Sequence, residues 1–207
     1  IGPEIKETDV LIPATDGFML HGTLREPINV SLKGVIQIHP GWGLHQFIYS
    51  NFANFFAEAG YVVLTFDYRG IGRSVIPLSL INKFDAPMSD HGLIDMPAVL
   101  NWVIDKYPHQ KKIVIGHSLG GQILGLMDNC DKIDRIYTIG SAIGYFKILR
   151  KPMDLLLPHI FFKLVPIYAW MYRNSGIFKR YLNKYLGITA ASVIEWKEWC
   201  SGPDYFR

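Results

Sequence analysis

Four short apolar runs divide the first two thirds of the chain and limit what it can fold into. These runs are GVIQIH (34–39), YVVLTF (61–66), KIVIG (112–116) and RIYTIG (135–140). Continuous runs rich in Val, Ile and Tyr are typical of strands that are covered on both faces, as in a parallel sheet. The sequence therefore predicts four buried, parallel strands.

Helical segments are predicted between these runs, at residues 48–59, 95–106 and 119–129. The residues expected on their apolar faces are Phe52, Phe55, Phe56 and Ala59 in the first helix, and Val99, Trp102 and Val103 in the second. Alternating strands and helices predict right-handed crossovers with helices on both faces of the sheet. Residues 8–24, TDVLIPATDGFMLHGTL, predict an antiparallel hairpin that turns at Asp16-Gly17. We expect an α/β fold with a mostly parallel sheet and an N-terminal hairpin.

Residues 145–207 break this alternation and look mainly helical and aromatic. They carry 10 Lys and Arg against 4 Asp and Glu, whereas residues 1–144 carry 11 against 14. The cations are interleaved with large apolar residues, so we expect no nucleic-acid partner, and membrane contact is left open but not favoured. The stretch Leu155–Tyr172 is interrupted by two prolines, a histidine and a lysine, which argues against a transmembrane helix. We expect a core at 1–144 and a helical cap at 145–207.

The run IVIGHSLGGQ (113–122) places a serine where a predicted buried strand meets a predicted helix. Ser118 lies between Gly116 and Gly120, and a strand-turn-helix junction of this kind holds a nucleophilic hydroxyl clear of the sheet. Side chains at the two glycine positions would clash in such a turn. A serine that only caps a helix is the alternative, but a cap needs no glycines two residues away on either side.

Two further loops follow strands on the same side of the predicted sheet. HPGWG (39–43) has small residues that let backbone N–H groups turn inward, as an oxyanion hole requires. DYRGIGRS (67–74) lacks the spacing of a phosphate-binding loop, and we expect Asp67 and Arg69 to brace the neighbouring loops. The sequence indicates no metal site and no cofactor. Cys130 and Cys200 form no CxxC pair, and the start shows no secretory signal, so a cytoplasmic location is expected.

HPGWG, FDYRGIGRS and IVIGHSLGGQ, in this order, resemble the α/β-hydrolase superfamily. Residues 34–121 resemble in particular predicted serine hydrolases of the serine-aminopeptidase-like or lysophospholipase-like type. The tail IEWKEWCSGPDYFR resembles the segment that closes the cap in an uncharacterised bacterial branch. The resemblance implies an α/β-hydrolase fold with a helical cap.

The resemblance also implies the roles of several residues. Ser118 is expected to be the nucleophile, and the backbone N–H groups of Leu119 and Trp42 are expected to form the oxyanion hole. Gly41, Trp42 and His117 are expected to contact the substrate. Serine at this position implies acyl transfer from an ester, thioester or amide, so an esterase- or lipase-like hydrolase is expected. The expected partner is an apolar small-molecule acyl substrate, and the sequence indicates no oligomeric state.

The catalytic acid and histidine are missing from the expected positions. The superfamily order is Ser, acid, His, yet the only histidine after Ser118 is His159 in the predicted cap, and the predicted sheet ends at residues 135–140. We expect the chain to be truncated at its C-terminus, with the acid, the histidine and the last strands beyond Arg207, and to be inactive alone. His39 and His159 are less favoured as the base. The alternative function is a hydrolase-fold binding protein without turnover.

The aromatic cap leaves two interpretations open. Large side chains there either line an acyl pocket or only pack the cap against the core. The residues concerned are Leu155, Phe161, Phe162, Trp170 and Tyr172.

Overall fold

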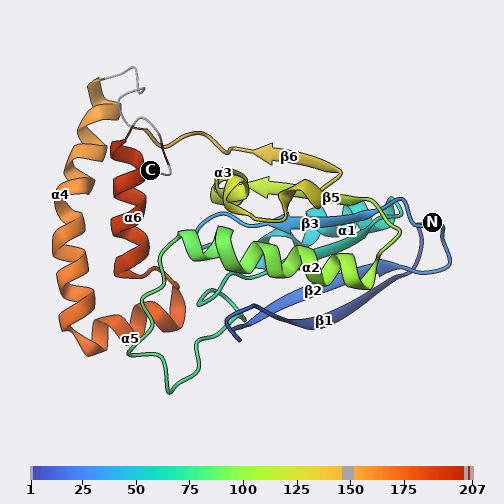
Figure 1. Cartoon of the computed structure of the whole chain (residues 1–207), viewed down its shortest axis with the longest axis horizontal. Coiled ribbons are helices and arrows are strands. Elements are labelled where there is room, and N and C mark those ends of the chain that lie inside the picture. Colours follow the sequence, from blue (N-terminus) through green and yellow to red (C-terminus); the bar gives the residue numbers. More distant parts are fainter. Residues whose placement is uncertain (1, 146–151, 203–204, 206–207) are drawn as a thin grey trace.

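A six-stranded sheet forms the centre of the chain in a computed structural model, which describes residues 2–145, 152–202 and 205 (Figure 1). Its strands are β1 (Ile5–Pro13), β2 (Met19–Pro27), β3 (Val35–His39), β4 (Val62–Phe66), β5 (Lys112–His117) and β6 (Arg135–Ile139). They lie in the order β1-β2-β4-β3-β5-β6. β3, β4, β5 and β6 are parallel, and the β1–β2 hairpin joins β4 antiparallel. The four predicted strands, the hairpin and the mostly parallel sheet are confirmed.

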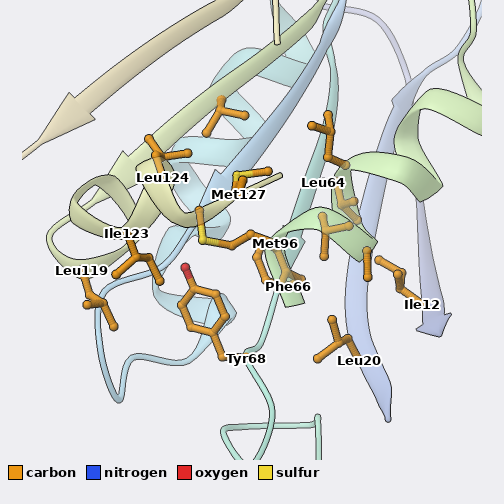
Figure 2. Close-up of a cluster of buried hydrophobic side chains, with 14 of the residues drawn as sticks. Ile12, Leu20, Leu64, Phe66, Tyr68, Met96, Leu119, Ile123, Leu124 and Met127 are labelled. Carbon is orange, nitrogen blue, oxygen red and sulfur yellow. The ribbon is translucent and has the colours of Figure 1, made fainter. Parts of the chain in front are cut away.

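Helices cover both faces of this sheet, as predicted. α1 (Ser50–Glu58) follows a 3₁₀ turn at Gln46–Tyr49 and packs on one face, over a cluster that includes Ile36, Ile38 and Ile115. α2 (Met96–Lys106), preceded by a π-helical turn at His91–Asp95, and α3 (Leu119–Gln122) pack on the other face. Figure 2 shows the cluster on that second face, where the Tyr68 ring lies near Leu119, Ile123 and Met96.

Two helix predictions need correction. The buried face of α1 is made by Ala53 and Ala57, whereas Phe52 and Phe55 are 38% and 64% exposed. The small side chains let α1 approach the sheet closely, and of the predicted phenylalanines Phe56 packs against the same cluster. The helix expected over 119–129 is also shorter, because α3 ends at Gln122 and continues as a 3₁₀ turn at Ile123–Leu126. Its sequence contains three glycines, which are poor helix formers.

Three further helices follow β6, which agrees with the helical character expected after residue 145. They are α4 (Pro152–Asn174), α5 (Gly176–Tyr185) and α6 (Ala190–Ser201). Figure 1 shows α4 and α6 standing at the end of the sheet toward which the β5 and β6 arrows point. Trp199 and Cys200 of α6 are buried in the cluster on the α2 and α3 face. No helix among the described residues is long and apolar enough to cross a membrane.

β6 is the last strand of the described sheet, and it differs from the other parallel strands. All five of its residues are exposed, including Ile136, Tyr137 and Ile139, which are about half exposed. β3 and β4 are by contrast buried along their whole length.

Candidate active site

The loops that carry the predicted site meet because β3 and β5 are neighbours in the sheet. Their register pairs His39 with Gly116, so residues 40–44 after β3 face Ser118 after β5. β3 is also where the chain changes direction across the sheet, since α1 leads from it to β4 on one side while β5 lies on the other. In open α/β sheets, ligands bind at the carboxyl ends of the strands at such a switch point.

Ser118 occupies a backbone conformation that side chains rarely adopt. Its φ is +50° and its ψ is −117°, and its N–H donates to the Ile139 carbonyl of β6 at 2.9 Å. The Ser118 carbonyl accepts from the N–H groups of Gly121 and Gln122, each at 3.1 Å. A positive φ at a residue other than glycine costs about 1–3 kcal/mol of free energy, and such residues cluster at active sites. The strained turn expected between β5 and α3 is therefore present.

The flanking glycines are required sterically. A Cβ on Gly116 would lie 2.6 Å from the Gly121 Cα and 2.7 Å from the Gly120 carbonyl oxygen. A Cβ on Gly120 would overlap the His39 carbonyl and lie 2.7 Å from the Pro40 oxygen. These contacts are with backbone atoms, which cannot rotate away, so the sequence-based explanation of these two glycines is confirmed.

A cavity of about 400 Å³ opens beside Ser118. Its described lining is Gly41, Trp42, Leu44, Met88, His117, Ser118, Leu119, Gln122, Gly140, Gly144 and Trp196. The structure thus brings together the residues predicted for the nucleophile, the oxyanion hole and substrate contact, namely Gly41, Trp42, His117, Ser118 and Leu119. Among the described residues, neither the Trp42 nor the Leu119 N–H has a hydrogen-bond acceptor, whereas the Gly41 N–H donates to the Tyr49 hydroxyl at 3.0 Å. Because α3 has only four residues, its helix dipole adds little here.

Trp196 of α6 lines the cavity and contacts aromatic rings of the loop after β3 and of α4. The ring of Trp196 on α6 lies 5.9 Å from that of Trp42, between centroids. Phe161 and Phe162 of α4 contact the Trp196 ring edge-to-face, at 5.3 and 6.3 Å.

The other aromatic candidates of the helical segment do not reach this cavity. Tyr172 is buried, and its hydroxyl donates to the Phe84 carbonyl at 2.8 Å, so it packs and does not line the cavity. Trp170 is 67% exposed, and the side chain of Leu155 lies outside the described part of the chain.

Asp67 braces the loop after β4, as predicted. Its Oδ1 accepts from the Gln46 N–H at 2.7 Å, and its Oδ2 accepts from Gln46 Nε2 and from the Arg73 N–H, both at 2.9 Å. A carboxylate fills the centre of the 67–74 loop, which agrees with the rejection of a phosphate site.

Arg69 forms a second buried network that joins three segments. Its Nε donates to Asp95 Oδ1 at 2.8 Å, and its Nη1 donates to Asp16 in the β1–β2 turn at 2.7 Å. Asp95 Oδ2 also accepts from the Arg69 N–H at 3.1 Å and lies 3.0 Å from His91 Nδ1. The role of Arg69 was expected, but Asp95, Asp16 and His91 were not, because no motif marks them.

The described residues near Ser118 include no evident pair of a general base and an acid. His39 is buried against Phe66, and burial lowers its pKa to about 3, so its imidazole stays neutral. His39 also does not belong to the described lining of the cavity. His159 lies exposed on α4. His117 is the only histidine in the described lining, which contains no carboxylate. The described residues also contain no group of three metal-ligating side chains.

Comparisons with known proteins identify the fold of this chain. The family model described as alpha/beta hydrolase fold matches residues 34–162. A hypothetical protein from Pseudomonas aeruginosa has a similar structure, with a TM-score of 0.65 and 15% identity over 92% of this chain and 70% of its own. A thermostable carboxyl esterase from Bacillus coagulans gives a TM-score of 0.57 at 19% identity over 84% of this chain.

An esterase from Pyrococcus furiosus is similar as well, with a TM-score of 0.56 and 22% identity over 75% of this chain and 64% of its own. The chain spans 55% of the length of the Bacillus coagulans esterase. A search of curated protein sequences finds no match. Because the family model covers more than half of the chain, the chain belongs to the alpha/beta hydrolase fold family.

Proposed function

We propose that this protein is a serine hydrolase that acts on acyl esters, with Ser118 as its nucleophile. The observation that carries the proposal is the strained Ser118 turn at the wall of one cavity, beside the Trp42 and Leu119 amides, which have no acceptor among the described residues. The Ser118 oxygen attacks the ester carbonyl, and the two amides stabilise the negative charge that develops on the carbonyl oxygen. The alcohol leaves with a proton, and water then hydrolyses the acyl-enzyme.

The general base and its acid partner come, in this proposal, from residues outside the described lining of the cavity. A serine hydroxyl is a weak nucleophile until a base takes its proton. His117 is the nearest candidate among the described residues, but its Nδ1 already contacts the Tyr49 hydroxyl at 2.8 Å.

An apolar acyl group fits the described lining best. Trp42, Met88, Leu119 and Trp196 provide apolar surface, and Phe161 and Phe162 lie beside Trp196. The esterases of similar fold from Bacillus coagulans and Pyrococcus furiosus support ester chemistry. We place residues 145–207 in the role of a cap, because α6 contributes Trp196 to the cavity.

The test is covalent labelling with a fluorophosphonate, which reacts only with an activated serine. The protein expressed from its complete reading frame is treated with the probe, digested and analysed by mass spectrometry. We expect an adduct on Ser118 that disappears in Ser118→Ala. Ser141→Ala is the matched control, because Ser141 lies next to the same turn, with its Oγ 3.4 Å from the Gly116 carbonyl oxygen. Absence of a Ser118 adduct in a folded protein contradicts the proposal.

A binding protein without turnover is the second candidate. The observation that favours it is the described cavity lining, which holds no carboxylate and only one histidine. Such a protein would bind an ester in a calorimetric titration without hydrolysing it and without labelling at Ser118.

A further inference from the structure

The Tyr49 hydroxyl lies between two groups of the candidate site. It accepts a hydrogen bond from the Gly41 N–H at 3.0 Å, and it lies 2.8 Å from His117 Nδ1. The Tyr49 and His117 rings meet edge-to-face, with centroids 5.9 Å apart. Tyr49 thus links the loop after β3 to the residue that precedes Ser118 on β5.

The directions of these two hydrogen bonds follow from the chemistry of the groups. Burial raises the pKa of the Tyr49 phenol, so the hydroxyl keeps its single proton near neutral pH. A backbone N–H can only donate, so the bond from Gly41 uses a lone pair of the Tyr49 oxygen. The hydroxyl proton then remains available for His117 Nδ1.

The position of the proton on His117 follows in turn. A neutral imidazole has one nitrogen that donates and one that accepts, and the partner of one nitrogen fixes the role of the other. If Nδ1 accepts from Tyr49, the proton of His117 is on Nε2. The opposite arrangement, with Nδ1 donating to Tyr49, leaves the hydroxyl proton without an acceptor among the described residues.

The Nε2 edge of His117 faces the end of β6. His117 Nε2 lies 4.0 Å from the position that a Cβ on Gly140 would occupy, and both residues line the cavity beside Ser118. Because Gly140 has no side chain, nothing from this residue covers the ring edge. The Nε2–H is therefore the donor of His117 on the side of Gly140, a residue that also lines the cavity.

We infer that Tyr49 holds His117 in its Nε2–H form, and that His117 donates a hydrogen bond to an oxygen of the bound acyl substrate and does not serve as the base. Tyr49 is then a positioning residue that acts through His117. The substrate part of this inference rests on the proposed function, whereas the position of the proton does not.

The first experiment locates the proton by ¹⁵N NMR of the chain labelled at histidine. We expect His117 to show a non-protonated Nδ1 and a protonated Nε2, with signals assigned by their loss in His117→Gln. Tyr49→Phe removes the hydroxyl, and both proton positions of His117 should then be populated. Tyr61→Phe is the matched control, because Tyr61 packs against the same cluster under α1, and it should leave the signals unchanged. A proton on Nδ1, or no response to Tyr49→Phe, overturns the inference.

The second experiment measures ester binding where no turnover can occur. In a Ser118→Ala background, p-nitrophenyl hexanoate is titrated into the protein from the complete reading frame. His117→Leu should weaken binding about 2- to 10-fold, which is what one neutral hydrogen bond of about 0.5–1.5 kcal/mol supplies. His117→Gln retains an N–H donor and should bind more tightly than His117→Leu. Equal binding by all three proteins, or no binding at all, overturns the substrate role of His117.

The two proposals fail in different ways. If Ser118 does not label but the NMR and binding results are as expected, the proposed hydrolase function is wrong and the role of His117 stands. If Ser118 labels in the parent protein but labels at least about 100-fold more slowly in His117→Gln, His117 is the general base and the inference is wrong.

Discussion

Replacing Asp95 by asparagine tests whether the buried network around Arg69 stabilises the fold. The Asp95 side chain is completely buried and that of Arg69 is 5% exposed. Asp95 Oδ1 accepts from Arg69 Nε, while Oδ2 accepts from the Arg69 N–H and contacts His91 Nδ1. The Asp95→Asn side chain would carry an NH₂ group in place of one oxygen. In either orientation that group faces an N–H of Arg69, so at least one buried hydrogen bond is lost along with the negative charge.

The expected cost follows from what Arg69 retains. Breaking a buried ion pair by removing one charge typically costs about 3–5 kcal/mol. Arg69 keeps Asp16 at 2.7 Å, and that carboxylate is partly exposed, so we expect the lower end of the range, about 3 kcal/mol. With a urea dependence of about 2 kcal/mol per molar, the unfolding midpoint would fall by about 1.5 M.

The matched control is Asp9→Asn. Asp9 accepts two hydrogen bonds from Arg73, at 2.7 and 2.8 Å, but both side chains are more than half exposed. Solvent screens such a pair, so its loss should change the urea midpoint little. Urea unfolding of the three proteins is followed by tryptophan fluorescence and circular dichroism at pH 7. If the urea midpoint falls no further in Asp95→Asn than in Asp9→Asn, the argument from burial is refuted.

Three further predictions use the same folded chain. Burial lowers the pKa of His39 to about 3 from an ordinary value of 6.5, so its contribution to stability is complete above pH 6.5 and is lost as the pH falls toward 3. Between pH 7 and pH 4.5, the free energy of unfolding of the wild type should therefore fall by about 2–3 kcal/mol more than that of His39→Gln, as measured by urea unfolding at each pH. Gly120→Ala should lower the free energy of unfolding by about 1–3 kcal/mol or more, since its Cβ would meet the His39 and Pro40 carbonyls, and an unchanged thermal midpoint would contradict this contact. Exposed Cys130 should react quickly with a disulfide reagent at pH 8, whereas Cys200, whose pKa burial raises to about 11, should react only after unfolding, as followed by absorbance with and without urea.

The sheet was predictable because its signal is local. Each parallel strand is a continuous apolar run, and such runs are readable one segment at a time. The strand order was not predictable in this way, since β3 pairs with β4 and β5, which lie far along the chain. The α1 error has a related cause. The spacing of Phe52 and Phe55 marks an apolar face, but only the distance between helix and sheet decides that Ala53 and Ala57 form the contact.

In the candidate site, too, contacts within one short segment were predictable, whereas contacts between distant residues were not. Ser118, Gly116 and Gly120 belong to one turn, so their arrangement follows from five consecutive residues. Tyr49 and His117 are 68 residues apart, and Arg69 and Asp95 are 26 apart. Side chains that meet over such separations leave no periodic signal in the sequence, so these contacts became visible only in the folded chain.

The placement of charge distinguishes the β4 side of the sheet from the Ser118 cavity between β3 and β5. The buried carboxylates Asp67 and Asp95 both lie on the β4 side, where N–H groups of Gln46, Arg73 and Arg69 surround them. The described lining of the Ser118 cavity has no carboxylate, so no negative charge there would oppose an oxyanion. In the proposed function, such an oxygen meets the Trp42 and Leu119 amides, which have no acceptor among the described residues and are fixed by the backbone, so they need no reorganisation when charge develops. The buried carboxylates therefore hold the loops on the β4 side, whereas the described lining of the Ser118 cavity offers neutral hydrogen-bond donors and no carboxylate.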